Sequence, residues 1–370
     1  MSPPWLGAVV TALALWFLLP AADAAIETEA PPVRAPLPQA LTEADTTRVT
    51  QTVDRGLAWL VTQVDREGAF AGGARTNGQP ALTSLSIMAF LSRGHRPGVG
   101  PYGDILNRAI DFALTCQKPS GLICYGQYDA EMAFNASDTY NHAITMLMLG
   151  EVYGMTVGER AIRVRQAIEK GLAFTHALWI SPKSPAETGG WRYLHQRFQS
   201  DLSVTGWYVA SLRSIKNAGF DVPKSVMDRT SEYVVQCYSQ PTRTFTYRGP
   251  AQPRPSVAMT GAGILSLALA GKPTHPCALA AAESLARETF DARTYRCYYA
   301  CYYATQAAAQ IAGETWRTVY RKVATFLLTV QAGNGQWPPI DQQEYGPVYS
   351  TSLAILSLTP HFQLLPIYQH

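Results

Sequence analysis

The sequence predicts an all-α protein, an α/α toroid (α6/α6 barrel) in which six helical hairpins supply twelve main helices in two concentric layers. Three observations predict this architecture. A helix that is apolar on nearly all sides recurs along the chain, an amphipathic helix precedes each copy, and the two-residue alternation typical of strands is short and isolated.

The repeat is visible because six stretches align on one column, which holds threonine in five copies and histidine in the second. The copies follow one another at about fifty residues, which leaves room for two helices of about 15 residues plus loops. The aligned residues are Thr83, His142, Thr205, Thr260, Thr305 and Thr351.

Each aligned stretch is apolar or small on nearly every side, and this composition predicts a buried helix. The preceding helices carry a polar face and are expected over 53–63, 105–116, 161–177, 224–236, 279–290 and 317–331. A linear stack would leave the apolar helices exposed at both ends, whereas a closed ring would not. We therefore expect the apolar helices innermost and the amphipathic helices outside.

Residues 189–219 show one repeat unit in full. A Gly-Gly turn precedes Trp191 and Tyr193, and Ser200 and Asp201 occupy the positions of a helix N-cap. An apolar helix follows and runs to 217–219, where Asn and Gly are typical of a helix C-terminus.

The first residues predict export. An apolar run over 6–19 is too short to span a bilayer, and Ala22-Asp23-Ala24 after it has the small-x-small form of a cleavage site. We expect a signal peptide over 1–24, a proline-rich disordered linker over 25–47 and a toroid domain over 48–370. The protein would then be periplasmic, extracellular or associated with the cell envelope. An uncleaved N-terminal membrane anchor is the alternative.

Charge is sparse. Charged residues make up 15% of the 370 residues, against about 25% in typical soluble proteins, so much of the chain should be buried or line an apolar space. The net charge is only +3 and the basic residues are scattered, which argues against nucleic acid as a partner. No phosphate loop, dinucleotide fingerprint or nucleophile elbow occurs, so we expect no cofactor.

The six cysteines are disulfide candidates, because an even number after an export signal favours disulfides. They are Cys116, Cys124, Cys237, Cys277, Cys297 and Cys301, and the first two flank a short turn that would allow a local bridge. A metal site built from His275, Cys277, Cys297 and Cys301 is the less favoured alternative, because this spacing matches no known zinc pattern. We therefore expect no metal.

The loops carry a motif that runs basic-Gly, an aromatic, Gln and then Gly-x-Trp. Its best copies are 55–70, through Arg55, Gly56, Trp59, Gln63 and Gly68, and 322–337, through Lys322, Gln331, Gly335 and Trp337. Through this QW repeat, about residues 48–360 resemble the squalene cyclase and protein prenyltransferase β-subunit superfamily, whose members are α/α toroids. We expect the Gln to bond orphan carbonyls at the end of the outer helix and the Gly to permit the turn.

The resemblance implies the fold and not the activity. The Asp-x-Asp-Asp tetrad with which the cyclases protonate an alkene is absent, and so are the Asp-x-Cys zinc motif and the Asp-Asp-x-x-Asp diphosphate motif of the prenyltransferases. An enzyme of this kind would be isoprenoid cyclase-like and would lack the usual catalytic residues.

Three residues that enter the inner helices could still act as acids: Asp138, His142 and Asp201. His142 could donate a proton near neutral pH, with Asp138 orienting it from one helical turn away. The simpler interpretation, which we favour, is that both aspartates are N-caps and that His142 is a satisfied buried histidine.

Aromatic residues are expected around the lumen, where they could contact a polyprenyl chain or stabilise a cation. The candidates are Tyr140, Trp191, Tyr193, Trp207, Tyr299, Tyr303, Tyr345 and Tyr349. Plain core packing is the alternative interpretation, and we favour it.

Three hypotheses for the function remain. The first is an exported toroid that binds an apolar, isoprenoid-like or polymeric ligand in its lumen without turnover. The second is a terpenoid cyclase-type or transferase-type enzyme that lacks the usual motifs, and the third is an envelope scaffold that binds protein partners through its loops. A wide apolar cavity would favour the first, and a lumen plugged by side chains would favour the third.

Overall fold

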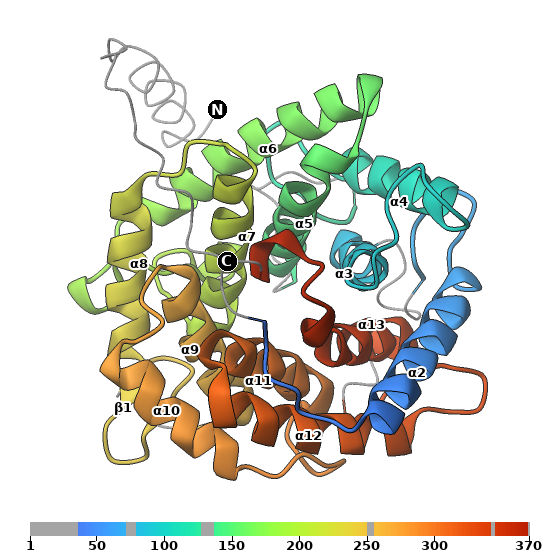
Figure 1. The fold of residues 1–370 in the computed structure, drawn as a ribbon. Coiled ribbons are helices and arrows are strands. Elements are labelled where there is room, and N and C mark those ends of the chain that lie inside the picture. Colours follow the sequence, from blue (N-terminus) through green and yellow to red (C-terminus); the bar gives the residue numbers. More distant parts are fainter. Residues whose placement is uncertain (1–35, 72–78, 127–136, 250–254, 342–344, 369–370) are drawn as a thin grey trace.

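The computed structural model describes residues 36–71, 79–126, 137–249, 255–341 and 345–368. Twelve α-helices lie in these residues, and they form a closed ring of two layers (Figure 1). The predicted all-α toroid of six hairpins is confirmed. A two-stranded antiparallel hairpin, β1 (Tyr238–Ser239) and β2 (Thr244–Phe245), is the sheet of the described chain.

The inner layer holds six helices, and each contacts the next around the ring, from the first to the last and back to the first. They are α3 (Pro80–Leu91), α5 (Asp138–Val152), α7 (Leu202–Asn217), α9 (Val257–Leu269), α11 (Cys297–Ile311) and α13 (Gly346–Leu358). Thr83, His142, Thr205, Thr260, Thr305 and Thr351 all lie on these helices, as expected, and all are buried.

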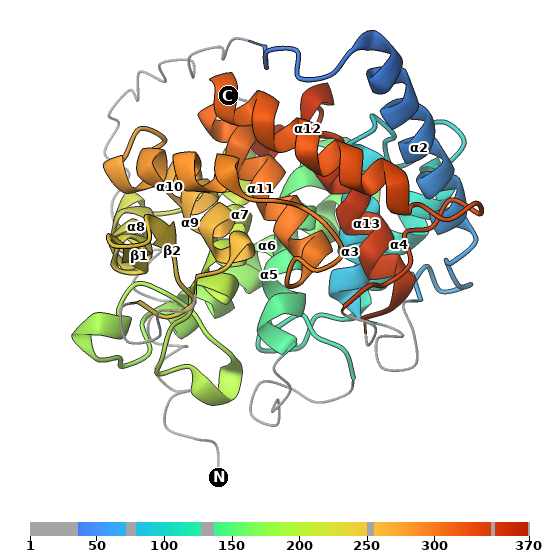
Figure 2. The same cartoon turned by 90° about the horizontal axis from the view of Figure 1, so that it is seen from below.

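The outer layer holds the amphipathic helices. They are α2 (Glu43–Val61), α4 (Gly103–Thr115), α6 (Gly158–Trp179), α8 (Lys224–Gln236), α10 (Pro276–Arg287) and α12 (Gly313–Val330). Figure 2 shows α10, α12 and α2 following one another around the outside of the ring. The ring closes where α12 and α13 pack against α2 and α3, and Arg55 Nη2 donates to Gln331 Oε1 across this join at 2.6 Å.

In four of the six hairpins a glycine turn contacts the next outer helix. Gly68, Gly121, Gly189 and Gly335 have φ between 92° and 103°, a region that L side chains rarely adopt. A Cβ built on Gly335 would lie 2.4 Å from the Arg55 carbonyl oxygen of α2, and the other three glycines approach outer-helix carbonyls in the same way. These turns therefore need glycine both for their φ and for the close approach.

The glutamine of the QW repeat acts differently from our expectation. Gln331 Nε2 donates to the Gly335 carbonyl of its own turn at 2.8 Å and to the Thr52 carbonyl of α2 at 2.9 Å. Gln117 bonds Gly121 and Ala167 of α6 in the same manner. Because the distant acceptor lies within the next outer helix, these two glutamines link neighbouring repeats. Gln63 of the first copy does not, since its Nε2 donates to Thr62 Oγ1 at 2.7 Å.

The aligned threonine column has a shared structural role. Thr83, Thr205 and Thr351 accept hydrogen bonds through Oγ1 from the backbone N–H of Phe70, Trp191 and Trp337, at 3.0 to 3.1 Å. Each donor is the residue that ends the loop motif. The inner helix therefore satisfies a buried N–H of the loop that leads into it, which would otherwise cost about 1–3 kcal/mol.

Two members of the column do not share this role. Thr305 bonds back to the carbonyls of Cys301 and Tyr302 on its own helix. It is the ninth residue of α11, whereas Thr205 is the fourth residue of α7. The sequence alignment therefore placed α11 out of register with the other inner helices by more than one helical turn. No hydrogen bond of the Thr260 side chain to a loop is found in the described chain.

The disulfide prediction is not supported, because none of the six cysteines, all of which lie in the described residues, forms a disulfide. Burial raises the pKa of Cys116 and of Cys237 to about 11 and that of Cys297 to about 12. The thiolate is the species that reacts in disulfide exchange, so these thiols are held in their unreactive form.

Helix α2 begins at Glu43, inside the segment that we expected to be a linker, and Thr42 caps it. The residues before it also pack on the ring, because Trp316 Nε1 donates to the Pro38 carbonyl at 2.8 Å and Ala40 is buried. The predicted signal peptide and its cleavage site lie outside the described residues.

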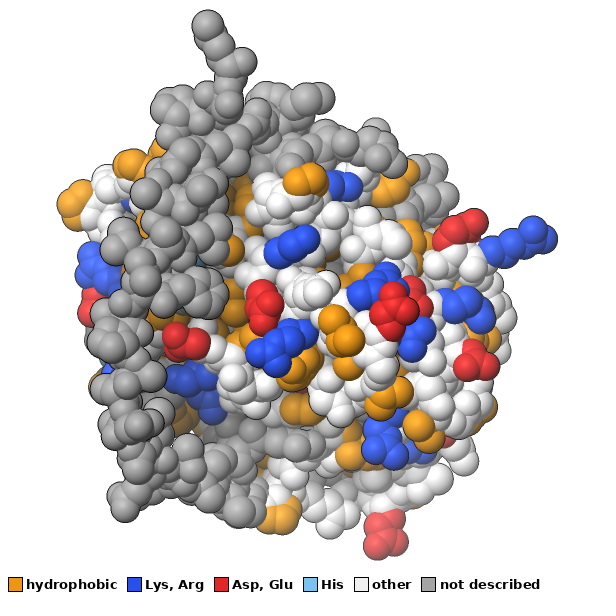
Figure 3. Space-filling model, turned by 90° about the horizontal axis from the view of Figure 1, so that it is seen from above, with side chains coloured by type: hydrophobic (Ala, Val, Ile, Leu, Met, Phe, Trp, Pro, Cys, Tyr) orange, Lys and Arg blue, Asp and Glu red, His pale blue; other side chains and the backbone are white. Residues whose placement is uncertain are grey.

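None of the described helices combines the length and the apolar character needed to cross a membrane. In the face shown in Figure 3, basic and acidic side chains are interspersed over the described surface. This mixture fits the small net charge of +3.

The glycine turns can be tested with two alanine variants. Gly335→Ala should lower the free energy of unfolding by at least about 3 kcal/mol, because it adds a clash with the Arg55 carbonyl to the backbone strain. Gly271→Ala has a similar φ of 82° but open space around it, so strain alone should cost about 1 kcal/mol. Urea denaturation measures both, and equal losses would contradict the proposed contact.

Candidate functional site

The N-terminal ends of the inner helices meet at one opening of the ring, which we call the mouth. Tyr140 lies in the first turn of α5, Ser203 in that of α7, Tyr299 in that of α11 and Tyr349 in that of α13. Because every inner helix follows an outer helix and leads to the next, all six run in the same direction. Residues far apart in sequence are brought together here.

A chain of hydrogen bonds crosses the mouth. Tyr193 OH lies 3.0 Å from Tyr247 OH, which accepts from Arg192 Nη1 at 3.3 Å. The same Arg192 nitrogen pairs with Asp201 Oδ2 at 3.0 Å. Ser203 Oγ donates to Asp201 Oδ1, and Tyr140 OH lies 2.5 Å from Ser203 Oγ. These six residues, which we call the mouth cluster, connect α5, α7, the loop before α7 and the loop before α9.

Asp201 is the N-cap of α7, as the sequence predicted, and its Oδ1 accepts from Val204 N at 2.9 Å. Burial raises the pKa of the Asp201 carboxyl, while the Val204 N–H, the Ser203 hydroxyl and the Arg192 charge each oppose that rise. Both oxygens are already engaged and the side chain is 0% exposed. A substrate therefore has no access to a proton on this group.

His142 belongs to the repeat structure. Its Nδ1 accepts from the Ile123 backbone N–H at 3.2 Å, the role that threonine has in other repeats, and its Nε2 lies 3.0 Å from Thr175 Oγ1. Phe174 and Tyr208 pack against the imidazole ring of His142. Burial lowers the pKa of His142 to about 3, so the imidazole is neutral at ordinary pH and has no imidazolium proton to donate.

Asp138 is buried at the first position of α5, and the N-cap is Ser137, one residue earlier than we expected. The two ring nitrogens of His142 bond Ile123 and Thr175, which leaves no ring nitrogen for Asp138 to orient. His142, Asp138 and Asp201 therefore do not form one acid site.

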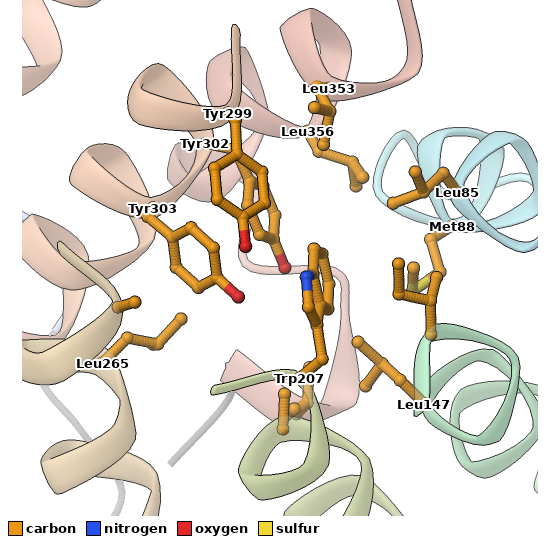
Figure 4. Close-up of a cluster of buried hydrophobic side chains, with 14 of the residues drawn as sticks. Leu85, Met88, Leu147, Trp207, Leu265, Tyr299, Tyr302, Tyr303, Leu353 and Leu356 are labelled. Atoms are coloured by element: carbon orange, nitrogen blue, oxygen red, sulfur yellow. The ribbon is translucent and has the colours of Figure 1, made fainter. Parts of the chain in front are cut away.

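A second aromatic group lies deeper in the lumen. The ring centroids of Trp207 and Tyr302 are 5.3 Å apart and nearly parallel, and Tyr299 and Tyr303 meet edge to face at 4.9 Å. Figure 4 shows the three tyrosines of α11 and Trp207 of α7 pointing toward one another. We call these four residues the central aromatic cluster. Tyr302 was not among the predicted residues.

Three polar atoms of this cluster make no hydrogen bond of good geometry in the described chain: Trp207 Nε1, Tyr299 OH and Tyr303 OH. Tyr299 nevertheless lies close enough to Tyr303 and Trp207 for their polar groups to affect its pKa, and burial raises the pKa of Tyr299 and Tyr303, so both phenols remain protonated. Poorly paired polar atoms at the centre of a core call for an explanation, and a binding role is one.

The rest of the lumen is lined by aliphatic side chains (Figure 4). These side chains are at most 2% exposed, so the described lumen is filled by its own lining and is not the wide cavity considered above. Leu265 of α9 lies beside Tyr303, and the others are Leu85 and Met88 of α3, Leu147 of α5, and Leu353 and Leu356 of α13.

The other predicted aromatic residues separate into two groups. The ring centroids of Tyr345 and Tyr349 lie 5.1 Å apart at the mouth. Both residues are close enough to Arg296 for its charge to interact with their phenols. Trp191 instead stacks on Tyr208 at 4.8 Å and donates to the Thr175 carbonyl. Trp191 therefore packs in the wall between α6 and α7, away from the lumen.

The sequence analysis did not predict Arg192 and Tyr247, two residues of the mouth cluster with side chains suited to binding a ligand. Arg192 lies over the Tyr193 and Tyr247 rings at 4.9 and 5.5 Å, so a guanidinium and two aromatic faces are stacked at the mouth. Arg192 stands between two residues that the sequence analysis singled out, but neither its burial nor its pairing with Asp201 can be read from that position. Tyr247 lies in a loop without a distinguishing motif.

Three exposed aromatic residues surround this end of the ring, each on a loop that leads into an inner helix. They are Tyr125, Phe198 and Tyr295, which precede α5, α7 and α11 and are 47%, 49% and 69% exposed. Arg197 lies over Phe198 at 4.5 Å and Arg296 over Tyr295 at 5.4 Å. We call these three residues the rim aromatics.

Among the described residues, no group of three or more His, Cys, Asp or Glu side chains could hold a metal ion. A surface depression of about 520 Å³ lies between residues 37–47 and α12. It is at the opposite end of the ring and contains none of the mouth residues.

The Arg192–Asp201 pair can be tested by a double-mutant cycle. Asp201→Asn keeps a capping oxygen but leaves Arg192 buried without its charge partner, so the free energy of unfolding should fall by about 3–5 kcal/mol. Arg192→Gln should cost a similar amount, and the double variant less than the sum. The exposed pair Arg165–Glu169 is the control and should couple by under about 0.5 kcal/mol. Additive losses at Arg192 and Asp201 would contradict the pairing.

A search of protein families with the sequence finds no match, and a search of curated proteins finds none. Solved structures are similar. A variant of the type II terpene cyclase MstE from Scytonema, in complex with merosterolic acid A as product, is 14% identical with a TM-score of 0.56, covering 87% of this chain and 100% of that chain.

Two carbohydrate-active enzymes are equally similar. A glycosidase in complex with glucose is 12% identical with a TM-score of 0.58, over 88% of this chain and 100% of that chain. A polysaccharide lyase is 9% identical with a TM-score of 0.54, over 86% of this chain and 98% of that chain. At these identities the likeness concerns the fold alone: the protein has the α/α-toroid fold that terpene cyclases share with carbohydrate-active enzymes.

Proposed function

We propose that the protein binds a saccharide chain at its mouth and does not hydrolyse it. The observation that carries the proposal is the mouth cluster, in which phenol hydroxyls, a guanidinium and a carboxylate form one connected network among aromatic rings. Such a surface offers flat apolar faces for the C–H faces of sugar rings together with hydrogen-bond groups for their hydroxyls. The phenol and serine hydroxyls of the network keep further donor or acceptor capacity that sugar hydroxyls could use, whereas the buried Asp201 carboxylate serves to hold the network together.

The rim aromatics extend the same chemistry outward. Phe198 and Tyr295 are large apolar side chains exposed to solvent, and each lies next to the guanidinium of a neighbouring arginine. An aromatic side chain has only two rotatable bonds, so it loses little entropy when a ligand stacks on it. A chain of several sugar units could contact the mouth cluster and one or more of the rim aromatics together.

Binding without hydrolysis follows from the state of the carboxylate. Glycosidases use two carboxyl groups that flank the scissile bond, one of which must give up a proton. Both oxygens of Asp201 are held by Val204, Ser203 and Arg192. Among the similar structures, the glycosidase binds glucose and another is a polysaccharide lyase, which supports a saccharide as the ligand class.

Binding of an apolar ligand in the lumen is a second candidate. The aliphatic lining and the poorly paired polar atoms of the central aromatic cluster favour it, and a related MstE structure contains geranylgeranyl dihydroxybenzoate as substrate. The present packing of the lumen opposes it, because a ligand of that size would have to displace the lining side chains. Mass spectrometry of small molecules that co-purify with the protein distinguishes the two, since only the second candidate predicts a recovered lipid.

Saccharide binding is tested by isothermal titration with a panel of neutral and acidic oligosaccharides. Phe198→Ala and Tyr295→Ala should each weaken the affinity for the bound oligosaccharide about tenfold, which corresponds to about 1.4 kcal/mol of lost stacking. Both residues are exposed, so the variants should fold normally.

Ile162→Ala, which removes an equally exposed apolar side chain from the outer helix α6, is the matched control and should leave the affinity unchanged. Absence of binding across the whole panel, or equal affinity of wild type and both rim variants, would refute the proposal.

A further inference from the structure

The C-terminal residues close the end of the lumen opposite the mouth. After α13 the chain turns inward through the short 3-10 helices η6 (Pro360–Phe362) and η7 (Pro366–Tyr368), and Figure 1 shows this segment over the centre of the ring. Leu365 and Ile367 are 5% and 1% exposed, and η7 packs against α7. We call residues 363–368 the plug.

Two polar contacts hold the plug inside the ring. Tyr368 OH lies 2.7 Å from Tyr302 OH of the central aromatic cluster. The Ile367 backbone N–H donates to Glu151 Oε2 of α5 at 3.2 Å. The plug is therefore fixed to the inner layer by one phenol pair and one carboxyl group.

Glu151 has the surroundings of a neutral acid. Its Oε1 lies 2.5 Å from Ser214 Oγ, which is also 3.3 Å from the Leu147 carbonyl oxygen. Ser214 has one hydroxyl proton and faces two acceptors. If Glu151 is protonated, its own proton serves the short contact and Ser214 donates to Leu147, so every group is satisfied. An ionised Glu151 would leave the Leu147 contact unmade and bury a charge.

No basic residue compensates that charge, since Glu151 takes part in no ion pair of the described chain. The groups that contact it are Ser214 of α7 and Ile367 of the plug. The titratable groups that face it are Tyr302 of α11 and Tyr368 of the plug, both protonated phenols. Its side chain is buried, so ionisation would have to be accompanied by entry of water.

We propose that the plug is a pH-controlled closure of the lumen, which stays seated while Glu151 is protonated and withdraws when Glu151 ionises. Withdrawal would let water reach the carboxylate at the cost of the Ile367 and Tyr368 contacts. It would also expose the central aromatic cluster beside Tyr302 to solvent from the end opposite the mouth. The inference is independent of the saccharide proposal, which concerns the other end of the ring.

The direction and size of the pH effect on the plug follow from the thermodynamic linkage between proton binding by Glu151 and the position of the plug. Burial raises the pKa of Glu151 from 4.5 to about 7 in the seated state, and exposure on withdrawal would return it toward 4.5. The seated state then binds the proton more tightly. Its population is therefore highest below pH 4.5 and falls as the pH rises through 7. Between pH 5 and pH 8 the ratio of seated to withdrawn plug should fall roughly 50- to 100-fold.

Hydrogen exchange followed by mass spectrometry on the intact protein measures this ratio. The protection factors of the amides in residues 363–368 should fall roughly 50- to 100-fold from pH 5 to pH 8, after correction for intrinsic exchange rates. Amides of the outer helix α8 report global opening and should keep their protection. Glu151→Gln, which keeps an acceptor for Ile367 and cannot ionise, should remove the pH dependence with the plug still protected.

Tyr368→Phe is the matched control, because it removes the Tyr302 contact and leaves Glu151 intact. It should lower plug protection equally at both pH values and keep the pH dependence. Should Glu151→Gln fail to fold, Ile367→Pro removes the N–H donor and should give weak protection at both pH values without a pH dependence. Plug protection in the wild type that does not change with pH, or a Glu151→Gln protein with the wild-type dependence, would overturn the proposal.

Discussion

The fold depends on the contact between a glycine turn and the backbone of the next outer helix. At Gly335 the turn approaches the Arg55 carbonyl so closely that a Cβ would lie 2.4 Å from it, and Gln331 bonds the same two backbones together. The loop that leaves this turn is then held by Thr351 of the inner helix. Outer helix, turn and inner helix are thus fixed to one another and to the next repeat. Because the last repeat makes this contact with the first, the ring has no free end.

This constraint explains why His142 and Trp191, which the sequence analysis considered as catalytic and ligand-binding candidates, have structural roles. His142 accepts the loop N–H of Ile123, as Thr205 accepts that of Trp191, and the Trp191 indole donates to the outer helix of its own hairpin. A histidine is larger than threonine and reaches a second partner, Thr175, which makes it a stronger link between the layers. The polar groups available to a ligand are instead those that do not hold the turn, the loop and the inner helix together. They gather at the mouth around Arg192.

The periodic features were predictable from the sequence because they are local. The inner and outer helices follow from hydrophobic pattern alone, and Asp201 follows from capping chemistry. What could not be predicted depends on contacts between distant repeats. The partner of Asp201 is Arg192 and that of Arg192 is Tyr247, and only closure of the loops over the mouth brings them together. Thr305 was misassigned for a related reason, since Tyr and Ala residues fill α11 without a break that marks its start.

The two ends of the lumen differ in a way that bears on how such a toroid can acquire a function. At the mouth, every inner helix presents its first turn, and these turns carry the polar and aromatic side chains of Tyr140, Ser203 and Tyr299. At the other end, the helices finish against the chain's own C-terminus, where Glu151 and Tyr302 meet Ile367 and Tyr368. The centre between them keeps polar atoms, on Trp207 and Tyr299, that make no hydrogen bond of good geometry in the described chain. A closed ring can tolerate this cost because its stability comes from contacts between neighbouring repeats, which leaves the axis of the ring available for groups that serve binding.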